Sequence, residues 1–324
     1  MIGKGIITAT FVLACITTGS AQPVTAQPDS EAGQVRTWQL PASMVGQAEI
    51  EAAIAARAWD RAAQLIAAEV ERTPGRRELY ALAAQVFLLD RKPLNAAIAI
   101  KKAEALGPID DRLRFSLALA YVAMGRGDWA RPELERLAAG RPEDMRYPYW
   151  LARLDYDAGR YAAAIARLER VVAREPDFVR AYDNLALCYD AQHDAGRARA
   201  AHVEAVRRNR LASAKSPWPP LNYGSFLMNL GELAEAESLL REAVQYDEEL
   251  APAHHALGTL LERTGRLDEA VAELSRAATV DPAYPEPHYA LARIHRRKGR
   301  VAEADAALAT FRRLQELKEE QRQP

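Results

Sequence analysis

Residues 256–282 read ALGTLLERTGRLDEAVAELSRAATVDP and contain the pattern that decides the fold. Apolar side chains recur three or four residues apart on both sides of Gly265, which predicts two amphipathic helices joined by a short turn. Glycine suits such a turn because it adopts the left-handed backbone conformation that ends a helix. Pro282 cannot continue a helix and closes the pair. The stretch therefore predicts a helical hairpin with a defined stop.

The same hairpin recurs along most of the chain. One position is alanine in every repeat, with a spacing of 34 residues that lengthens once to 38: Ala62, Ala96, Ala130, Ala164, Ala198, Ala236, Ala270 and Ala304. A fixed period of this length is typical of stacked helical repeats. We therefore expect about eight hairpins.

Other positions keep the same frame and predict the turn, the stop and the packing. The turn position lies five residues before the alanine: Arg57, Arg91, Gly125, Gly159, His193, Gly231, Gly265 and Gly299. A proline follows the alanine by twelve residues in five repeats: Pro74, Pro108, Pro142, Pro176 and Pro282. In all repeats but the first, a small residue lies twelve residues before the alanine: Ala84, Ala118, Ala152, Ala186, Gly224, Gly258 and Ala292. Small residues let the two helices approach closely, and each hairpin needs its neighbours to bury its apolar faces.

The run from Leu257 to Leu261, with Ala270, Leu274, Ala277 and Pro282, resembles the signature of the tetratricopeptide repeat (TPR) family. The resemblance implies an all-α fold, a right-handed α-solenoid of about eight helical hairpins. We delimit the repeats as 43–76, 77–110, 111–144, 145–178, 179–212, 217–250, 251–284 and 285–318. The first carries Glu49 where others are apolar and is expected to form a polar cap. Residues 319–324 form a charged tail.

Composition argues against several functions. The chain has 43 basic and 44 acidic side chains, scattered among one another, so no nucleic-acid partner is expected. The basic run from Arg293 to Lys298 is either a solvated helix end or a surface for an anionic partner.

His254 and His255 are adjacent on a helix and point about 100° apart, so they make no metal site. His202 occupies an inward-facing position and is expected to be half-buried and hydrogen-bonded. No catalytic or nucleotide-binding motif occurs, which predicts neither an enzyme nor a cofactor.

The first residues resemble an export signal. Lys4 precedes an apolar run, and small residues lead to a cleavage site after Ala21, which predicts a signal peptide at 1–21 and a linker at 22–42. The apolar run is too short to span a bilayer, so the mature chain is expected to have no transmembrane span. Alternatively, Cys15 is the lipidated cysteine of a lipoprotein, with the following Thr/Gln/Pro-rich stretch as its tether. Cys188 is the only other cysteine, which excludes an intramolecular disulfide in the mature chain.

In the TPR family the first helix of each hairpin lines a concave groove that holds peptides, so the resemblance implies a binding site on the exposed side of these helices. The candidate residues are Tyr149, Arg153, Tyr156, Asp183, Asn184, Asn222, Ser225, His255, Tyr289 and Arg293. One subclass clamps a C-terminal carboxylate with lysines and asparagines. Asn184 and Asn222 resemble part of that clamp, but its lysines are missing and Arg153 is the one available charge.

The Pro-rich stretch 211–220 predicts a stiff, extended insert that bends the array or presents Trp218, unless it is merely a tolerated surface loop.

These features favour an exported, non-catalytic adaptor that binds a protein or peptide partner in the periplasm. The alternative is an outer-membrane lipoprotein that forms a structural part of a secretion, pilus or envelope-assembly complex. The mass of the mature N-terminus separates the two, because lipidation retains residues 15–21 and adds acyl chains.

Overall fold

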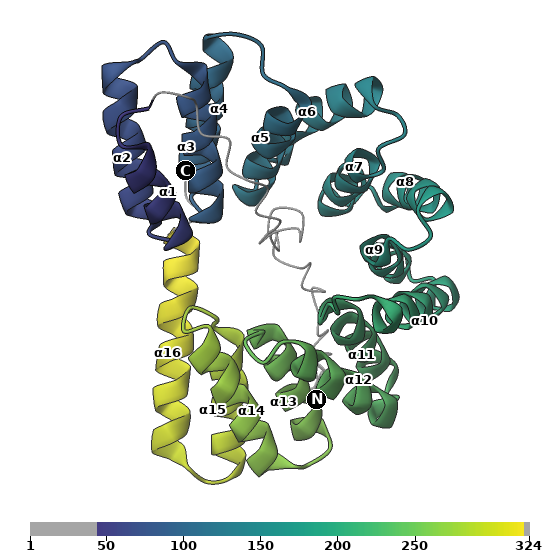
Figure 1. Ribbon diagram of the computed structural model, residues 1–324. Coiled ribbons are helices and arrows are strands. Elements are labelled where there is room, and N and C mark those ends of the chain that lie inside the picture. The colour runs from purple at the N-terminus through teal and green to yellow at the C-terminus, as the bar shows by residue number, and fades with distance from the viewer. Residues whose placement is uncertain (1–43, 321–324) are drawn as a thin grey trace, which may run out of the picture. The chain divides into compact units, whose positions relative to one another are not determined.

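A computed structural model of the protein describes residues 44–320, which divide into two compact units at Gly140. All regular structure in this range is helical (Figure 1). The first unit contains α1 (Gln47–Ala55), α2 (Trp59–Arg72), α3 (Arg77–Leu89), α4 (Pro93–Ala105), α5 (Asp111–Ala123) and α6 (Gly127–Gly140). The second contains α7 (Arg146–Asp157), α8 (Tyr161–Arg174), α9 (Val179–Ala191), α10 (Ala195–Leu211), α11 (Trp218–Leu230), α12 (Leu233–Tyr246), α13 (Ala251–Arg263), α14 (Leu267–Val280), α15 (Glu286–Arg297) and α16 (Val301–Glu320). The predicted signal peptide, the linker and Cys15 lie outside the described residues.

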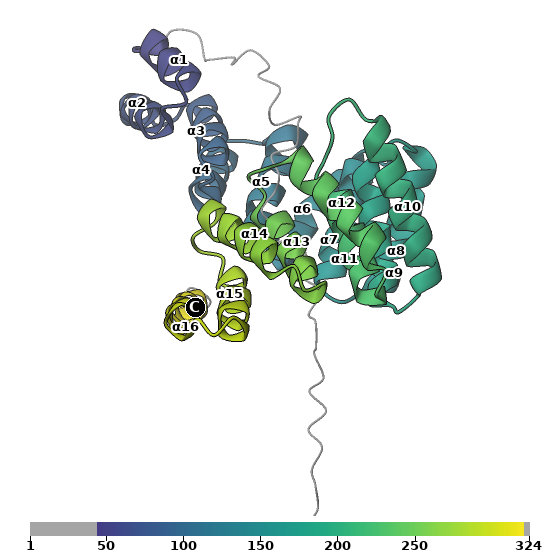
Figure 2. The same cartoon turned by 90° about the horizontal axis from the view of Figure 1, so that it is seen from below.

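The helices pair in chain order. Each odd-numbered helix packs against the even-numbered helix that follows it, and α3 with α4 or α15 with α16 can be followed side by side in both views (Figures 1 and 2). Within each unit, the second helix of a hairpin also packs against the first helix of the next. The predicted fold class, an all-α array of about eight hairpins, is confirmed. None of the helices between residues 44 and 320 has both the length and the apolar character needed to cross a bilayer.

The alanine position is the centre of every hairpin. All eight alanines are buried, with at most 1% of their surface exposed. The partner position on the first helix is as tightly packed: a methyl group added to Gly258 would lie 2.7 Å from Cγ of Leu274. At Gly224 the same methyl would lie 2.9 Å from Leu240. The prediction that small residues bring the two helices close together is confirmed.

The turn position has the left-handed conformation predicted for its glycines, and it has this conformation in all eight hairpins. Its φ angle lies between 54° and 81° at every site, whether or not the residue is glycine. Arg57, Arg91 and His193 adopt it at φ 54°, 55° and 60°. A side chain in this region costs roughly 1–2 kcal/mol, so the repeat imposes the conformation on these three residues.

The insert between the fifth and sixth repeats is helical at both ends, and the predicted extended conformation is wrong there. Arg210 stands where five repeats carry proline, and α10 continues past it to Leu211. Trp218 begins α11 and is half-buried. The prolines that follow it fit the helix because a proline in the first turn loses no hydrogen bond. Asn209, which is 1% exposed, ties the connection by donating to the Ser216 carbonyl at 2.8 Å and accepting from the Ser216 N–H at 2.9 Å.

Candidate binding face on the first helices

The first helices of the second unit form one layer. α7 contacts α9, α9 contacts α11, α11 contacts α13 and α13 contacts α15. Figure 1 shows them as a row, with the second helices of the hairpins in a separate row. All ten predicted site residues lie on these five helices. We call this surface the first-helix face.

A buried polar cluster joins α7 to α9. Asn184 donates from Nδ2 to the Tyr149 hydroxyl at 3.0 Å and to the Arg180 carbonyl at 2.7 Å. Its Oδ1 accepts from Nη1 of Arg153 at 2.5 Å. Tyr149, Arg153 and Asn184 are 5%, 6% and 4% exposed. Asn184 therefore joins the two helices through one donor and its acceptor, and its other donor bonds a carbonyl of its own helix.

Aromatic rings enclose the cluster. The ring of Tyr149 lies 4.8 Å from Phe178 and 5.6 Å from Trp150, and the Arg180 guanidinium carbon is 5.4 Å from both Tyr149 and Phe178. Burial raises the pKa of Tyr149. The sequence analysis missed Phe178 and Arg180, although both precede Asn184 within two turns of helix.

Arg153 is the unusual member of this cluster. Within residues 44–320 its one hydrogen-bond partner is the Asn184 amide, and no carboxylate lies within ion-pair distance. The surroundings are desolvated, since burial raises the pKa of Tyr156 and of the Cys188 thiol to about 12. Burial also raises the pKa of Asp157, an effect that the charge of Arg153 opposes. A guanidinium has five N–H donors, so most of those on Arg153 are left for another acceptor.

A second polar pair joins α9 to α11. Asn222 donates from Nδ2 to both carboxylate oxygens of Asp183, at 3.1 and 2.9 Å. Asp183 is 2% exposed, whereas Asn222 is half-buried. Ser225 donates to the carbonyl of Leu221 at 2.8 Å, within its own helix.

The remaining candidates lie on α13 and α15. His255 is within 3.1 Å of the Tyr284 hydroxyl, and burial followed by the charge of Arg293 lowers its pKa to about 4. Arg293 forms an ion pair with Glu262, which is 6% exposed. Tyr289 is 49% exposed, with its ring 5.2 Å from Phe311. Tyr289 is therefore the most accessible aromatic side chain among the predicted site residues.

The structure corrects one property expected of these residues. Tyr149, Arg153, Asp183 and Asn184 were expected on the exposed side of the first helices, but all four are buried. The reason is that consecutive first helices contact each other, so polar side chains at these positions pair across the contact. Their role in partner binding stays a prediction. Tyr156 is half-buried, and its ring packs edge-on against Tyr161 at 5.4 Å.

Other sequence predictions are resolved by contacts outside this cluster. The basic run on α15 is neutralised, since Arg293 and Arg297 contact Glu262, Arg296 contacts Asp305 and Lys298 contacts Asp268. His202 is fully buried and neither ring nitrogen has a hydrogen-bond partner, so the expected half-buried, bonded histidine is wrong. No group of His, Cys, Asp and Glu side chains within residues 44–320 is arranged to hold a metal ion.

Comparison with protein families identifies the repeats. A family model described as "TPR repeat" matches residues 263–299, and two described as "Tetratricopeptide repeat" match residues 227–279 and 149–213. All three matches fall in the second unit. A comparison with curated proteins finds no match.

Solved structures of the same fold cover most of the chain. The APC/C hetero-tetramer Cut9–Hcn1 matches with a TM-score of 0.61 at 16% identity, over 76% of this chain and 48% of that one. This chain thus spans about half the length of that relative. TTC0263, a thermophilic TPR protein in Thermus thermophilus, matches with a TM-score of 0.50 at 27% identity, over 61% of this chain and all of that one. PilW, described as a widely conserved type IV pilus biogenesis factor, matches with a TM-score of 0.55 at 15% identity, over 62% of this chain and 91% of that one.

The matched repeats, the buried alanine positions and the paired helices agree with one another. TPR proteins bind protein partners through such hairpins, and nothing in the described residues indicates a catalytic site. Residues 149–213 and 227–299 of the chain therefore carry tetratricopeptide repeats.

Proposed function

We propose that the protein is a non-catalytic interaction scaffold of the bacterial cell envelope that binds a peptide or protein segment on the first-helix face of its second unit. The observation that carries the proposal is Arg153, a cation that is 6% exposed and bonded to a single amide. A buried charge that forms no ion pair costs several kcal/mol, and a partner carboxylate that pairs with it offsets that cost. The partner segment is therefore acidic where it meets α7 and α9.

The rest of the face suits an extended segment. The exposed ring of Tyr289 offers an anchor on α15, and the half-buried side chains of Asn222 and Ser225 offer polar contacts on α11. Aromatic and arginine side chains are the usual anchors of protein interfaces. The paired residues beneath them hold these anchors in place before binding, which lowers the entropic cost of association.

Export is the second part of the proposal. It rests on the sequence of residues 1–21, with cleavage after Ala21, and it places the scaffold in the periplasm. The alternative is a lipoprotein of the outer membrane, lipidated at Cys15 and built into a secretion, pilus or envelope-assembly complex. The apolar run that leads directly to Cys15 is the observation behind this alternative. The likeness to PilW supports the shared fold alone.

Affinity capture from periplasmic and membrane extracts tests the binding face. The bait variants are Arg153→Gln, which removes the charge, and Arg170→Gln, which removes the same charge from the exposed surface of α8 in the same hairpin. We expect wild type and Arg170→Gln to retain a partner that Arg153→Gln loses, with all three proteins folded by circular dichroism. Equal capture by a folded Arg153→Gln protein would place the binding surface elsewhere. If Arg153→Gln does not fold, Tyr289→Ala tests the same face at an exposed position.

Mass spectrometry of the mature protein distinguishes the two attachments. A chain that begins at Gln22 supports the periplasmic scaffold. A chain that begins at Cys15 and carries acyl groups supports the lipoprotein. An unprocessed chain that stays in the cytoplasm would refute both.

A further inference from the structure

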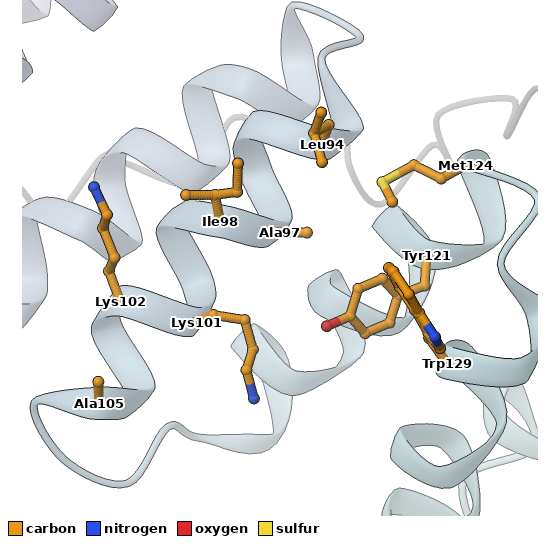
Figure 3. A pocket seen from close by; sticks show the side chains of 9 residues that line it. All are labelled: Leu94, Ala97, Ile98, Lys101, Lys102, Ala105, Tyr121, Met124 and Trp129. Atoms are coloured by element: carbon orange, nitrogen blue, oxygen red, sulfur yellow. The ribbon is translucent and has the colours of Figure 1, made fainter. Parts of the chain in front are cut away.

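A cavity of about 390 Å³ opens on the surface of the first unit (Figure 3). One wall is α4, and the other is formed by the end of α5, the turn after it and the start of α6. Figure 3 shows Leu94 and Ile98 on α4 across from Met124 and Trp129, while Lys101 and Lys102 lie further along α4. The cavity is therefore apolar at one end and basic at the other.

Three of its large apolar side chains are exposed to solvent. Leu94, Ile98 and Trp129 are 55%, 48% and 46% exposed. On α4 the side chains buried inside the array include Ala96, Ile100 and Ala103, which follow a different stripe. Leu94 and Ile98 form their own stripe, four residues apart, with Lys102 four residues further on. Large apolar side chains grouped around one cavity mark an interaction surface.

Trp129 is fixed in position from two sides. The Arg126 guanidinium lies 3.8 Å from the centre of the indole ring, and the ring of Tyr121 meets it edge-on at 5.5 Å. A cation and an aromatic neighbour restrict the rotation of the side chain, so Trp129 is ordered before any partner arrives. Ordered tryptophans are frequent among the residues that dominate binding energy.

The basic end carries an uncompensated charge. Lys101 donates to Glu104 at 2.6 Å, whereas Lys102 has no carboxylate within ion-pair distance anywhere in residues 44–320. Its ammonium lies 6.0 Å from the Tyr80 ring. Lys102 is eight residues from Leu94, which places the two about 12 Å apart along the helix axis.

We propose that this cavity is a docking surface for an acidic amphipathic helix of a partner protein. Apolar side chains of the partner pack against Leu94, Ile98 and Trp129, and a carboxylate about two turns away pairs with Lys102. A helix suits the cavity better than an extended peptide because both walls are helices, whose backbone groups are already bonded and cannot pair with a strand. A second copy of the same surface fits less well, since the one acid on α4, Glu104, is already bonded to Lys101.

A designed peptide tests the proposal. The probe is a fluorescein-labelled amphipathic helix of about five turns, with leucines every three or four residues at its centre and glutamates in its first and last turns, so that neither orientation is assumed. Its matched control carries lysine in place of those glutamates. Fluorescence anisotropy with the full chain measures both affinities.

We expect the acidic peptide to bind wild type more tightly than the basic peptide. Lys102→Glu should weaken the acidic peptide by about fivefold to tenfold and favour the basic one, because reversing the charge replaces attraction by repulsion. Ile98→Asp should abolish binding of both. The controls are Lys318→Glu on α16, where Lys318 lies 3.8 Å from Glu286, and Val203→Asp on α10. They introduce the same acidic residues at exposed positions elsewhere and should leave binding unchanged.

Three results would overturn the proposal. One is a failure of the acidic peptide to bind wild type, and another is equal binding to wild type, Lys102→Glu and a folded Ile98→Asp protein. The third is sedimentation showing that wild type self-associates and that Ile98→Asp is monomeric, because the occupant would then be a second copy. None of these results bears on Arg153 or the first-helix face.

Discussion

Replacing His202 by leucine should stabilise the protein, and by more at low pH than at high pH. His202 is fully buried on α10, with its ring stacked on Tyr223 at 5.3 Å and tilted against Phe226 at 5.1 Å. Neither ring nitrogen has a partner. Every other repeat carries leucine or isoleucine at this position, so His202→Leu restores the side chain that the packing accommodates.

Two effects set the expected magnitude. At pH 8 the neutral ring leaves polar nitrogens unsatisfied, which costs about 1–3 kcal/mol that leucine recovers. Below pH 6.5 a second effect is added, because burial lowers the pKa of His202 to about 3. The unfolded chain binds a proton that the folded chain excludes, so stability is lost as pH falls from 6.5 towards 3. At pH 5 this loss amounts to about 2 kcal/mol for wild type and is absent in His202→Leu.

Urea unfolding followed by circular dichroism at pH 8 and pH 5 measures both effects. His202→Phe is the control, because it changes the packing in a different way but also removes the titrating group. Both variants should lose about 2 kcal/mol less than wild type between the two pH values. If all three proteins lose the same free energy of unfolding between pH 8 and pH 5, His202 takes up a proton in the folded state. That result would refute the burial of His202 without hydrogen-bond partners.

Four further substitutions test the repeat frame, each by thermal melting. Ala164→Leu should destabilise the array by roughly 1–3 kcal/mol because it forces the helices of one hairpin apart, and a melting temperature equal to wild type would show that the alanine position is not a close contact. Gly258→Ala should lower stability, since its methyl meets Leu274 at 2.7 Å, while Gly140→Ala, whose methyl meets nothing within 4 Å, should raise it. Arg91→Gly should raise stability by about 1 kcal/mol because it relieves a side chain at φ 55°, and a loss would mean that the turn carries no strain.

The elements that the sequence predicted well depend on local sterics. A close helix crossing requires an alanine at one fixed position of each repeat, and a tight turn requires a left-handed residue at another. Both positions can be found in the sequence from their spacing. The repeat register placed Arg57, Arg91 and His193 at the turn position, and the structure shows that they share the left-handed conformation predicted for glycine there. The proline position alone does not set helix length, since α10 runs past Arg210 to Leu211, whereas α12, with Glu248 at the same position, ends at Tyr246.

The binding face was harder to predict because exposure depends on the neighbouring hairpin. Helical periodicity placed Tyr149, Arg153 and Asn184 on the first helices but could not reveal that these sides of α7 and α9 face and bury each other. The cavity of the first unit was missed for a different reason. Leu94 and Ile98 fall outside the repeating packing positions, and an apolar residue outside those positions was the signal available in the sequence.

The polar pairs and the alanines have separate roles in the array. The alanines set the distance between two helices of one hairpin, whereas the polar pairs join first helices of consecutive hairpins across 31 residues for Arg153 and Asn184 and 39 for Asp183 and Asn222. These pairs lie on the face where we propose that the partner binds. A partner carboxylate that reaches Arg153 can use its free donors and leave Asn184 bonded to Tyr149, so that binding adds to the contact between α7 and α9. A partner that instead displaced Asn184 would break that contact, and binding would then loosen the second unit. Amide hydrogen exchange in α7 and α9 distinguishes the two, and we expect the partner to slow it.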